Sequence, residues 1–330
     1  MRLIVAILKL ILGASLLIAT QAYASENRDG FDWLKVVILA EHQTEYSGVF
    51  IYQYENNVES SKISHVIVGD DYFERLENLD GPRREIVRHH GQVWSHIGDG
   101  REMVQVDSQQ QGLGKFSSLS GAQLHTLYMN YKAKVMGTDR VAGYDAQIIR
   151  FQPKDNLRYT YKIWVHKDSG LLLKSAVLGS KNQLIEQYSF TQLQIGGKID
   201  RSWVKKSAAT DHRGPRFHEK HQVSRMGIPI KSGWKSDAIP EGFVKTKEIE
   251  RPMHGNHEPV TQIVYSDGLS AISIFIEPDD NDEDDVEGLS SRGAVSLYHK
   301  VVGEHLFTVV GEVPPHTVMR VLDSIRRTGQ

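Results

Sequence analysis

The spacing of hydrophobic and polar positions changes several times along the chain, and each change predicts an element. Phe31, Leu34 and Ile38 recur at helical spacing, which predicts a helix. Asp29, just before them, is the expected N-cap. After Gly48 the period becomes two, as in strands with one buried face. Five short strands separated by turn signals follow, which predicts an antiparallel meander: 49–54, 62–68, 84–89, 92–97 and 102–106.

A second helix is predicted from Ser120 to about Lys132, where Leu124 and Leu127 belong to an apolar stripe. Period-two patterns then return. This order of elements predicts an α+β fold that is mainly antiparallel β, with one large curved sheet and helices on one of its faces. The expected strands after the helix are 145–151, 158–166, 171–178 and 184–193.

The apolar periodicity fades between about Lys205 and Ser232 and then resumes. Pro314-Pro315 opens a final helix with an apolar face. We therefore expect a smaller α+β domain after a linker, with boundaries at 25–205 for the first domain, 206–232 for the linker and 233–330 for the second domain. The strands expected in the second domain are 263–265, 270–276, 294–300 and 304–310.

The first 24 residues have the pattern of a secretory signal peptide. Arg2 and Lys9 precede a short apolar run that leads to Ala22-Tyr23-Ala24. A membrane anchor is the alternative, but it needs about 20 uninterrupted apolar residues, and Lys9 and Gln21 interrupt this run. We expect cleavage after Ala24 and export to the periplasm.

Charge and composition narrow the function. The net charge of −2 gives no global attraction to nucleic acid, and the absence of cysteine excludes thiol nucleophiles, zinc–thiolate sites and disulfides. No motif of a known nucleophile, phosphate loop or zinc protease occurs. We therefore expect neither an enzyme nor a cofactor.

Two clusters suggest metal binding, but neither pattern supports it. The densest histidine group lies in the expected linker, where no rigid frame would hold the rings. The acidic run Asp279–Asp285 lacks the glycine and glutamate that a helix-loop-helix calcium site needs at its sixth and twelfth positions. We expect solvated loops at both, and no metal site. The histidines concerned are His212, His218 and His221, with His254 and His257 further on.

A large curved sheet with helices against it can enclose an apolar cavity, and several strand aromatics are candidates to line it. The same side chains can instead form the core, and the sequence favours the core. The candidates are Phe50, Tyr52, Trp94, Tyr161 and Trp164.

Two adjacent arginines follow the turn Asp80-Gly81-Pro82. Alternation along the next strand puts Arg84, Ile86 and Arg88 on one face, with Arg83 on the other. Arg83 and Arg84 are candidates for polar contact with a partner or with an acidic lipid head group. The alternative is that they pair with Asp80 and Glu85 nearby.

Four stretches in order resemble the MucB/RseB family, whose members are periplasmic negative regulators of the envelope-stress sigma factor. One departure is Leu171-Leu172-Leu173, where the family often has a proline. The stretches are LENLDGPRREIVRHHGQVWS (76–95), RYTYKIWVHKDSGLLLKSAVLGSKNQLIEQYSF (158–190), VYSDGLSAISIFIEP (264–278) and VVGEVPPHTVMRVLDSIR (309–326).

The resemblance implies an N-terminal half-barrel like that of the lipoprotein carriers, with helices packed inside its curve, and a smaller C-terminal domain. It implies a regulatory protein that binds the periplasmic domain of a transmembrane anti-sigma factor of the MucA/RseA type and shields it from proteolysis. Lipopolysaccharide or lipoprotein acyl chains would release it. The alternative function is a periplasmic lipid or lipoprotein carrier that uses the same cavity. The sequence leaves the oligomeric state open, and a homodimer is one option.

Overall fold

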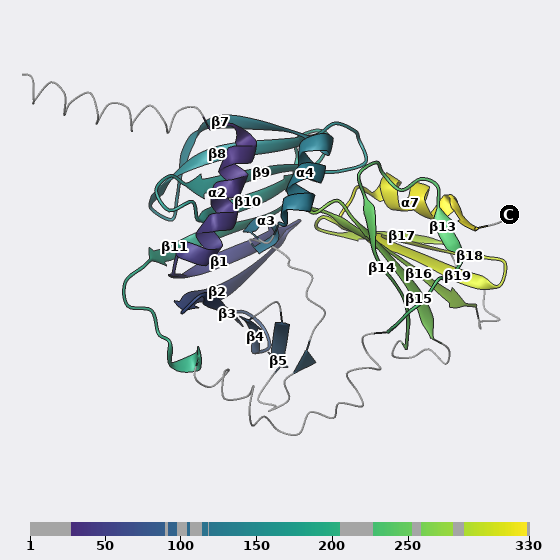
Figure 1. Cartoon of the computed structure of the whole chain (residues 1–330), viewed down its shortest axis with the longest axis horizontal. Coiled ribbons are helices and arrows are strands. Elements are labelled where there is room, and N and C mark those ends of the chain that lie inside the picture. The colour runs from purple at the N-terminus through teal and green to yellow at the C-terminus, as the bar shows by residue number, and fades with distance from the viewer. Residues whose placement is uncertain are drawn as a thin grey trace, which may run out of the picture.

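A computed structural model describes residues 28–89, 92–97, 104–105, 114–117, 119–204, 227–252, 259–279 and 287–328 (Figure 1). The expected signal peptide, the histidine-rich part of the linker, the 253–258 loop and the 280–286 acidic run lie outside these residues.

The first domain is built on one antiparallel sheet of eleven strands in the order β6-β5-β4-β3-β2-β1-β11-β10-β9-β8-β7. Two local meanders form this sheet, and β1 and β11 join them at its centre, with Tyr46 opposite Ile195. The strands are β1 Tyr46–Tyr54, β2 Asn57–Val68, β3 Asp71–Asn78, β4 Arg84–His89, β5 Gln92–Ile97, β6 Val104–Gln105, β7 Tyr131–Val141, β8 Tyr144–Pro153, β9 Thr160–His166, β10 Leu172–Leu178 and β11 Leu184–Ile195.

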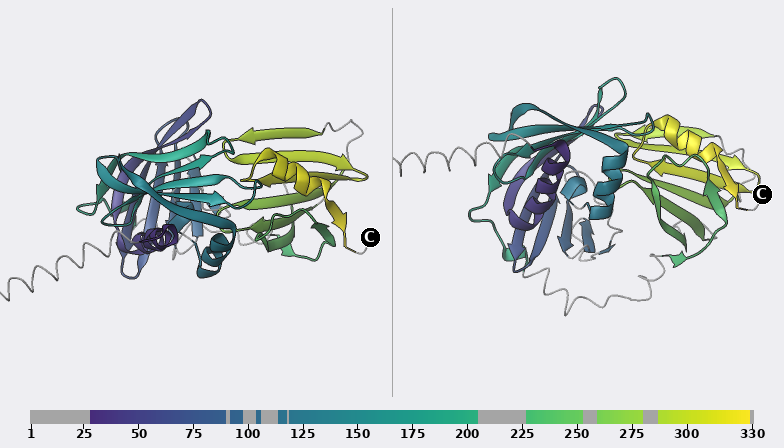
Figure 2. Two further views of the ribbon diagram at one scale, coloured as in Figure 1. Left: turned by 90° about the horizontal axis from the view of Figure 1, so that it is seen from above. Right: turned by 45° about the horizontal axis from the view of Figure 1, so that its top comes forward.

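Three helices, α2 Gly30–Gln43, α3 Gly114–Ser117 and α4 Gly121–Asn130, lie together against one face of this sheet (Figures 1 and 2). The Asp29 carboxylate caps α2 by accepting from the N–H groups of Phe31 and Asp32. Ser120 and Gln123 form a reciprocal capping box at the start of α4. Both predicted N-caps are confirmed. We call the face under the helices the concave face and the opposite face the convex face.

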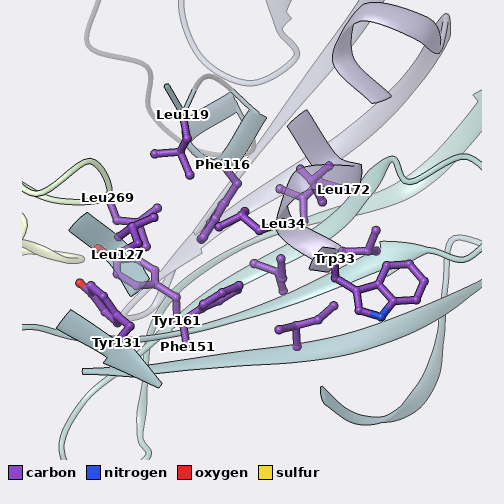
Figure 3. Packing of buried hydrophobic residues seen from close by; sticks show 14 of the residues in the cluster. Trp33, Leu34, Phe116, Leu119, Leu127, Tyr131, Phe151, Tyr161, Leu172 and Leu269 are labelled. Carbon is purple, nitrogen blue, oxygen red and sulfur yellow. The ribbon is translucent and has the colours of Figure 1, made fainter. Parts of the chain in front are cut away.

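The main core lies between the helices and strands β7–β10 of the concave face (Figure 3). Leu34 and Leu127 from the helices are fully buried against Phe151 and Tyr161 from the strands. Leu269 of the second domain belongs to the same cluster, so the two domains share part of one core.

The second domain is a seven-stranded antiparallel sheet in the order β12-β14-β15-β16-β19-β18-β17, with α7 Pro315–Asp323 packed on it. A small pair, β13 Trp234–Ser236 and β20 Ile325–Arg327, stands beside it. Ile228–Pro229, which the sequence assigns to the linker, already pairs with β14. The strands of the larger sheet are β12 Ile228–Pro229, β14 Val244–Arg251, β15 Val260–Ser266, β16 Ala271–Pro278, β17 Gly288–Arg292, β18 Val295–Val302 and β19 His305–Gly311.

The predicted fold class is confirmed: mainly antiparallel sheet, few helices and a smaller C-terminal domain. The predicted end of the second helix is wrong. The helix ends at Asn130, because Tyr131 already has extended backbone and begins β7. The Tyr131 hydroxyl donates to Asp267.

Candidate functional site

A cavity of about 520 Å³ opens on the concave face between α2, strands β1–β4, the start of β10, and β11. Its wall is part apolar, with Phe50, Ile63 and Leu76, and part charged, with Glu74 and Arg88. The C-terminal domain contributes two residues, Arg292 and Val295, to the same wall. The cavity is therefore completed only by both domains together.

Tyrosines form one side of the cavity. Tyr52 stacks on Tyr188 with ring centroids 4.4 Å apart and on Tyr54 at 4.9 Å. The Tyr52 hydroxyl donates to Glu186 Oε2 over 2.9 Å. Burial, and then the Glu186 charge, raise the pKa values of Tyr52 and Tyr188 well above their usual range. Both rings therefore stay neutral and present an apolar face with a hydroxyl edge.

A buried ion pair lies at another part of the wall. The Arg88 guanidinium donates to Glu74, whose side chain is only 8% exposed. The Glu74 carboxylate raises the pKa of Arg88 further, against the effect of burial. Behind this pair the His65 ring stacks between Tyr46 and Tyr72, with centroid distances of 5.0 Å to each. Polar groups are thus fixed in place before any ligand enters.

The hairpin between β17 and β18 closes the tyrosine end of the cavity. The backbone N–H of Ala294 donates to Glu186 Oε2 over 2.9 Å, the atom that also accepts from Tyr52. Arg292 lies 4.9 Å above the Tyr54 ring and donates to the Tyr54 hydroxyl. Gly293 has a φ of +57°, and a Cβ there would lie 2.5 Å from Glu186 Oε2, so the close approach requires glycine. We call residues 292–294 the hairpin tip.

A buried polar network holds the two domains together elsewhere. Arg158 Nε donates to Asp267 Oδ2 over 2.8 Å, and both side chains are 0% exposed. Burial raises the pKa of the Asp267 carboxyl, while the N–H groups of Ser270 and Leu269 and the Arg158 charge counteract that rise. The Tyr161 hydroxyl and Ser270 Oγ lie 2.9 Å apart in the same interface.

A second interdomain ion pair comes from α3. Lys115 Nζ lies 2.6 Å from Glu312 Oε2. Burial lowers the pKa of Lys115, but Glu312, Tyr161 and Glu186 together raise it by more, so the pKa lies above its usual value. The Lys115–Glu312 and Arg158–Asp267 pairs join residues far apart in the sequence. No local sequence pattern predicts either pair.

The two candidate arginines have separate environments. Arg84 and Arg88 line the cavity from the concave side of β4, as alternation predicts, and Arg83 is exposed outside it. The acids nearby have other partners: Asp80 accepts from the Ser60 N–H, and Glu85 pairs with Arg75. Within the described part of the chain, no ion pair joins Arg83 or Arg84 to an acid.

The five candidate aromatics also separate. Phe50 and Tyr52 line the cavity. Tyr161 is 1% exposed in the main core (Figure 3). Trp164 faces the convex side, between Lys162 and Lys174. The side chain of Trp94 lies outside the described residues.

Among the described residues, no group of three or more His, Cys, Asp or Glu side chains is arranged to hold a metal ion. The histidine group around residue 218, His254 with His257, and the acidic run at 280–285 lie outside those residues. No helix in the described part of the chain is long and apolar enough to cross a membrane.

Comparison with known proteins identifies the family. The MucB/RseB N-terminal domain matches residues 29–208, and the MucB/RseB C-terminal domain matches residues 229–326. The chain belongs to the MucB/RseB family. The first match covers the domain with the eleven-stranded sheet, and the second covers the smaller domain. Both matched domains contribute residues to the cavity wall.

Curated MucB/RseB relatives match over nearly the whole chain. The sigma factor AlgU regulatory protein MucB of Pseudomonas aeruginosa is 32% identical over 314 residues, 92% of each chain. The sigma-E factor regulatory protein RseB of Haemophilus influenzae is 25% identical over 317 residues, 96% of each chain.

Solved MucB structures show the same architecture. The MucB chain in the Pseudomonas aeruginosa MucA/MucB complex superposes with a TM-score of 0.71 at 29% identity, covering 92% of this chain and 100% of that chain. A second crystal structure of MucB superposes with a TM-score of 0.60 at 28% identity, covering 90% of this chain and 98% of that chain. This MucB/RseB chain therefore shares the two-domain fold of a protein solved with MucA.

Proposed function

We propose that this protein is a regulatory binding protein that holds the periplasmic domain of a membrane anti-sigma factor of the MucA/RseA type. The observation that carries the proposal is its likeness, across both domains, to a MucB chain solved in complex with MucA. The match to both domains matters, because a match to the first domain alone would support a lipid carrier equally well.

Binding protects the partner by mass action and occlusion. A protein that binds the protease-sensitive segment in a covered state lowers the fraction open to cleavage, without any bond being made or broken. We expect the contact surface to lie on the C-terminal domain and its face towards the first domain. The described residues there are held by the Arg158–Asp267 and Lys115–Glu312 pairs, so the surface is pre-organised.

The experiment is a protection assay with purified components. The chain from Ser25 onward is added to the periplasmic domain of the anti-sigma factor together with the protease that first cleaves it. The cleavage rate should fall as the chain approaches saturation. A rate that stays constant far above the measured dissociation constant contradicts the proposal, and a half-barrel protein from the lipoprotein carriers serves as the control.

We also propose that lipid-type signals, lipopolysaccharide or lipoprotein acyl chains, release the partner by entering the cavity. Phe50, Ile63 and Leu76 offer an apolar surface for acyl chains, and Arg84 lies at the wall as a cation for an acidic head group. A ligand that fills the tyrosine end competes with the hairpin tip, because Arg292 and Val295 already line that space. Displacing the tip disturbs the C-terminal domain, which is where we place the partner.

The cavity alone favours a second candidate, a periplasmic lipid or lipoprotein carrier. A carrier needs its cavity open to load cargo, whereas here the C-terminal hairpin closes one end. A transfer assay between donor and acceptor membranes separates the two functions. Transfer without any effect on proteolysis of the anti-sigma domain would favour the carrier.

Location follows from the same proposal. Export to the periplasm with cleavage after Ala24 puts the chain where the partner's domain lies. Mass spectrometry of the protein from a periplasmic extract should give an N-terminus at Ser25. An uncut N-terminus in the cytoplasmic fraction would contradict it.

A further inference from the structure

A row of basic side chains crosses the convex face of the first domain at strands β7–β10. Lys134 of β7 stands directly opposite Arg150 of β8, and Arg150 stands opposite Lys162 of β9. Lys174 of β10 stands opposite Trp164, two residues along β9 from Lys162. We call Lys134, Arg150, Lys162 and Lys174 the basic row.

Alternation along the strands fixes which way the basic row points. Val135, Ile149 and Ile163, the chain neighbours of three of its members, pack in the main core under the helices. The basic row therefore lies on the other, convex face, which is away from α2 and α4 (Figure 2). The cavity and the C-terminal hairpin have no part in it.

Within the described part of the chain, these four cations form no ion pair with an acid. Arg150 donates to the Asn182 side chain, a neutral partner. Lys162 and Lys174 lie 4.6 and 4.7 Å from the Trp164 ring centroid. Asp139 is the nearby acid, and it accepts from Trp164 Nε1.

Lys134 with Arg150, and Arg150 with Lys162, are cations that stand directly opposite one another on neighbouring strands. Like charges directly opposite one another on neighbouring strands destabilise a sheet. Burial lowers the pKa of Lys174; the Asp139 charge counteracts this, and the Lys162 charge adds a smaller lowering. Because the net charge of the whole chain is only −2, the row is a local feature and not an overall basic composition. A local conflict that is kept in the fold points to function.

We infer that the basic row docks the protein on a bilayer surface that carries anionic phospholipid head groups. Four adjacent strands spread the cations over about 14 Å, at about 4.8 Å per strand, which suits a surface better than a groove. Among the described residues of β7–β10, Met136 is the one large apolar side chain that is exposed. The other apolar side chains of this face, such as Trp164 and Ile148, are buried or half-buried, so charge is the main feature that the face presents to a partner.

Docking of this kind is weak and reversible, because each basic side chain near an anionic membrane adds about fivefold in affinity. The role of this docking rests on the proposed function. A protein held at a membrane surface has a higher effective concentration near a partner anchored in the same membrane. The binding itself requires no partner, so it can be tested separately.

The test is sedimentation of the chain from Ser25 onward, which contains every described residue, with lipid vesicles. Vesicles of phosphatidylcholine containing phosphatidylglycerol should bind it, and pure phosphatidylcholine should not. In about 1 M NaCl, where the Debye length is about 3 Å, binding should vanish. Lys134→Gln/Lys162→Gln/Lys174→Gln should weaken binding by about tenfold or more.

The matched control is Lys198→Gln/Lys231→Gln/Arg320→Gln, which removes the same charge from exposed positions outside the basic row. It should keep most of the binding. Equal binding to both kinds of vesicle, or equal losses in the two triple variants, would overturn the inference. Polyglutamate is the test for an acidic protein as the partner. If the chain binds polyglutamate more tightly than vesicles, and the basic-row variant weakens that binding equally, the face binds an acidic protein and the inference is overturned.

Two further measurements protect the test from a folding defect. The first is the salt dependence of vesicle binding, which is measured on the wild-type chain and so involves no substitution that could affect folding. Lys134→Glu alters only an exposed side chain of the edge strand and should by itself weaken binding to the anionic vesicles, so wild-type binding by this variant contradicts the inference. Affinity for the soluble anti-sigma domain, measured without lipid, should be the same for wild type and variants, which separates this inference from the proposed function.

Discussion

At the scale of single residues, Arg158 makes an unusual number of contacts between the two domains. Its guanidinium contacts Asp267 and Asp155, donates to the carbonyl of Glu241, and lies 5.0 Å from the Phe243 ring centroid. One side chain of the first domain thus meets three separate points of the second. Removing it leaves the Asp267 charge buried without a cation.

We predict that Arg158→Met lowers the free energy of unfolding by about 3–5 kcal/mol, the usual cost of leaving half of a buried ion pair. Urea denaturation measures it. Asp155→Asn is the control, because that carboxylate is 30% exposed and its loss should cost less than about 1 kcal/mol.

The double variant Arg158→Met/Asp267→Asn sharpens this prediction. Asn is neutral, and its oxygen can still accept from the N–H groups of Leu269 and Ser270. Most of the lost stability should therefore return. If it does not, Arg158 stabilises the interface through packing on Phe243 and not through its charge.

Gly170 shows how one residue positions a helix. It ends the β9–β10 turn with a φ of +76°, and a Cβ there would lie 2.5 Å from Val36 Cγ1 and 3.0 Å from the Val36 carbonyl oxygen. The turn therefore lies directly against α2, with no room for a side chain.

Gly170→Ala should cost about 1–3 kcal/mol more than Gly143→Ala. Both glycines have positive φ, but a Cβ at Gly143 meets nothing within 4 Å, so that variant measures backbone strain alone. Thermal unfolding of the two variants gives the comparison. Equal losses would mean that α2 moves aside without cost.

At the scale of elements, the sequence predicted those with a clean apolar period. Helices α2, α4 and α7 and most central strands follow directly from spacing and caps. Strand β3 was not predicted, because its Glu74 is turned inward to meet Arg88 and so breaks the polar–apolar alternation. Edge strand β7 was missed because most of its side chains are exposed.

The candidate site was predicted in part for the same reason. Phe50 and Tyr52 fall on the concave face by alternation alone. Glu186 was missed, although a lone acid that shares a strand face with Tyr188 and Phe190 is a detectable signal. Arg292 has no such signal, because its place in the cavity depends on how the domains meet.

The hairpin tip yields an element-scale prediction. Glu186→Gln keeps an oxygen acceptor but loses the charge that strengthens its bonds to Tyr52 and to the Ala294 N–H. Hydrogen exchange at Ala294 should become about tenfold faster, the difference between a charged and a neutral acceptor.

Glu59→Gln is the matched control for this prediction. Glu59 contacts Arg292 of the same hairpin tip but does not accept from Ala294. Equal exchange rates in the two variants would show that the tip is held by its packing and not by Glu186.

At the scale of the whole molecule, the cavity and the partner surface are expected to communicate through the hairpin tip. Leu76→Trp should narrow the cavity and weaken binding of a fluorescent acyl probe by about tenfold, because the larger side chain takes space that the acyl chain needs. Fluorescence titration measures this.

Leu79→Trp is the control, because Leu79 is 52% exposed and does not line the cavity. Leu76→Trp should still bind the anti-sigma domain, and acyl ligand should no longer release it. Unchanged probe affinity in Leu76→Trp would place the acyl site elsewhere.

The joining of β1 to β11 at the centre of the large sheet has a consequence for how the chain acquires its structure. Each meander pairs strands that are close in the sequence and can form quickly. The pairing of Tyr46 with Ile195 joins distant residues, so it forms only after both meanders are available. For a chain exported N-terminus first, as proposed above, the edge of β1 therefore stays exposed until the second meander has followed. We expect closure of this central seam to limit the folding rate, and the interval before closure to be when the protein most needs a chaperone.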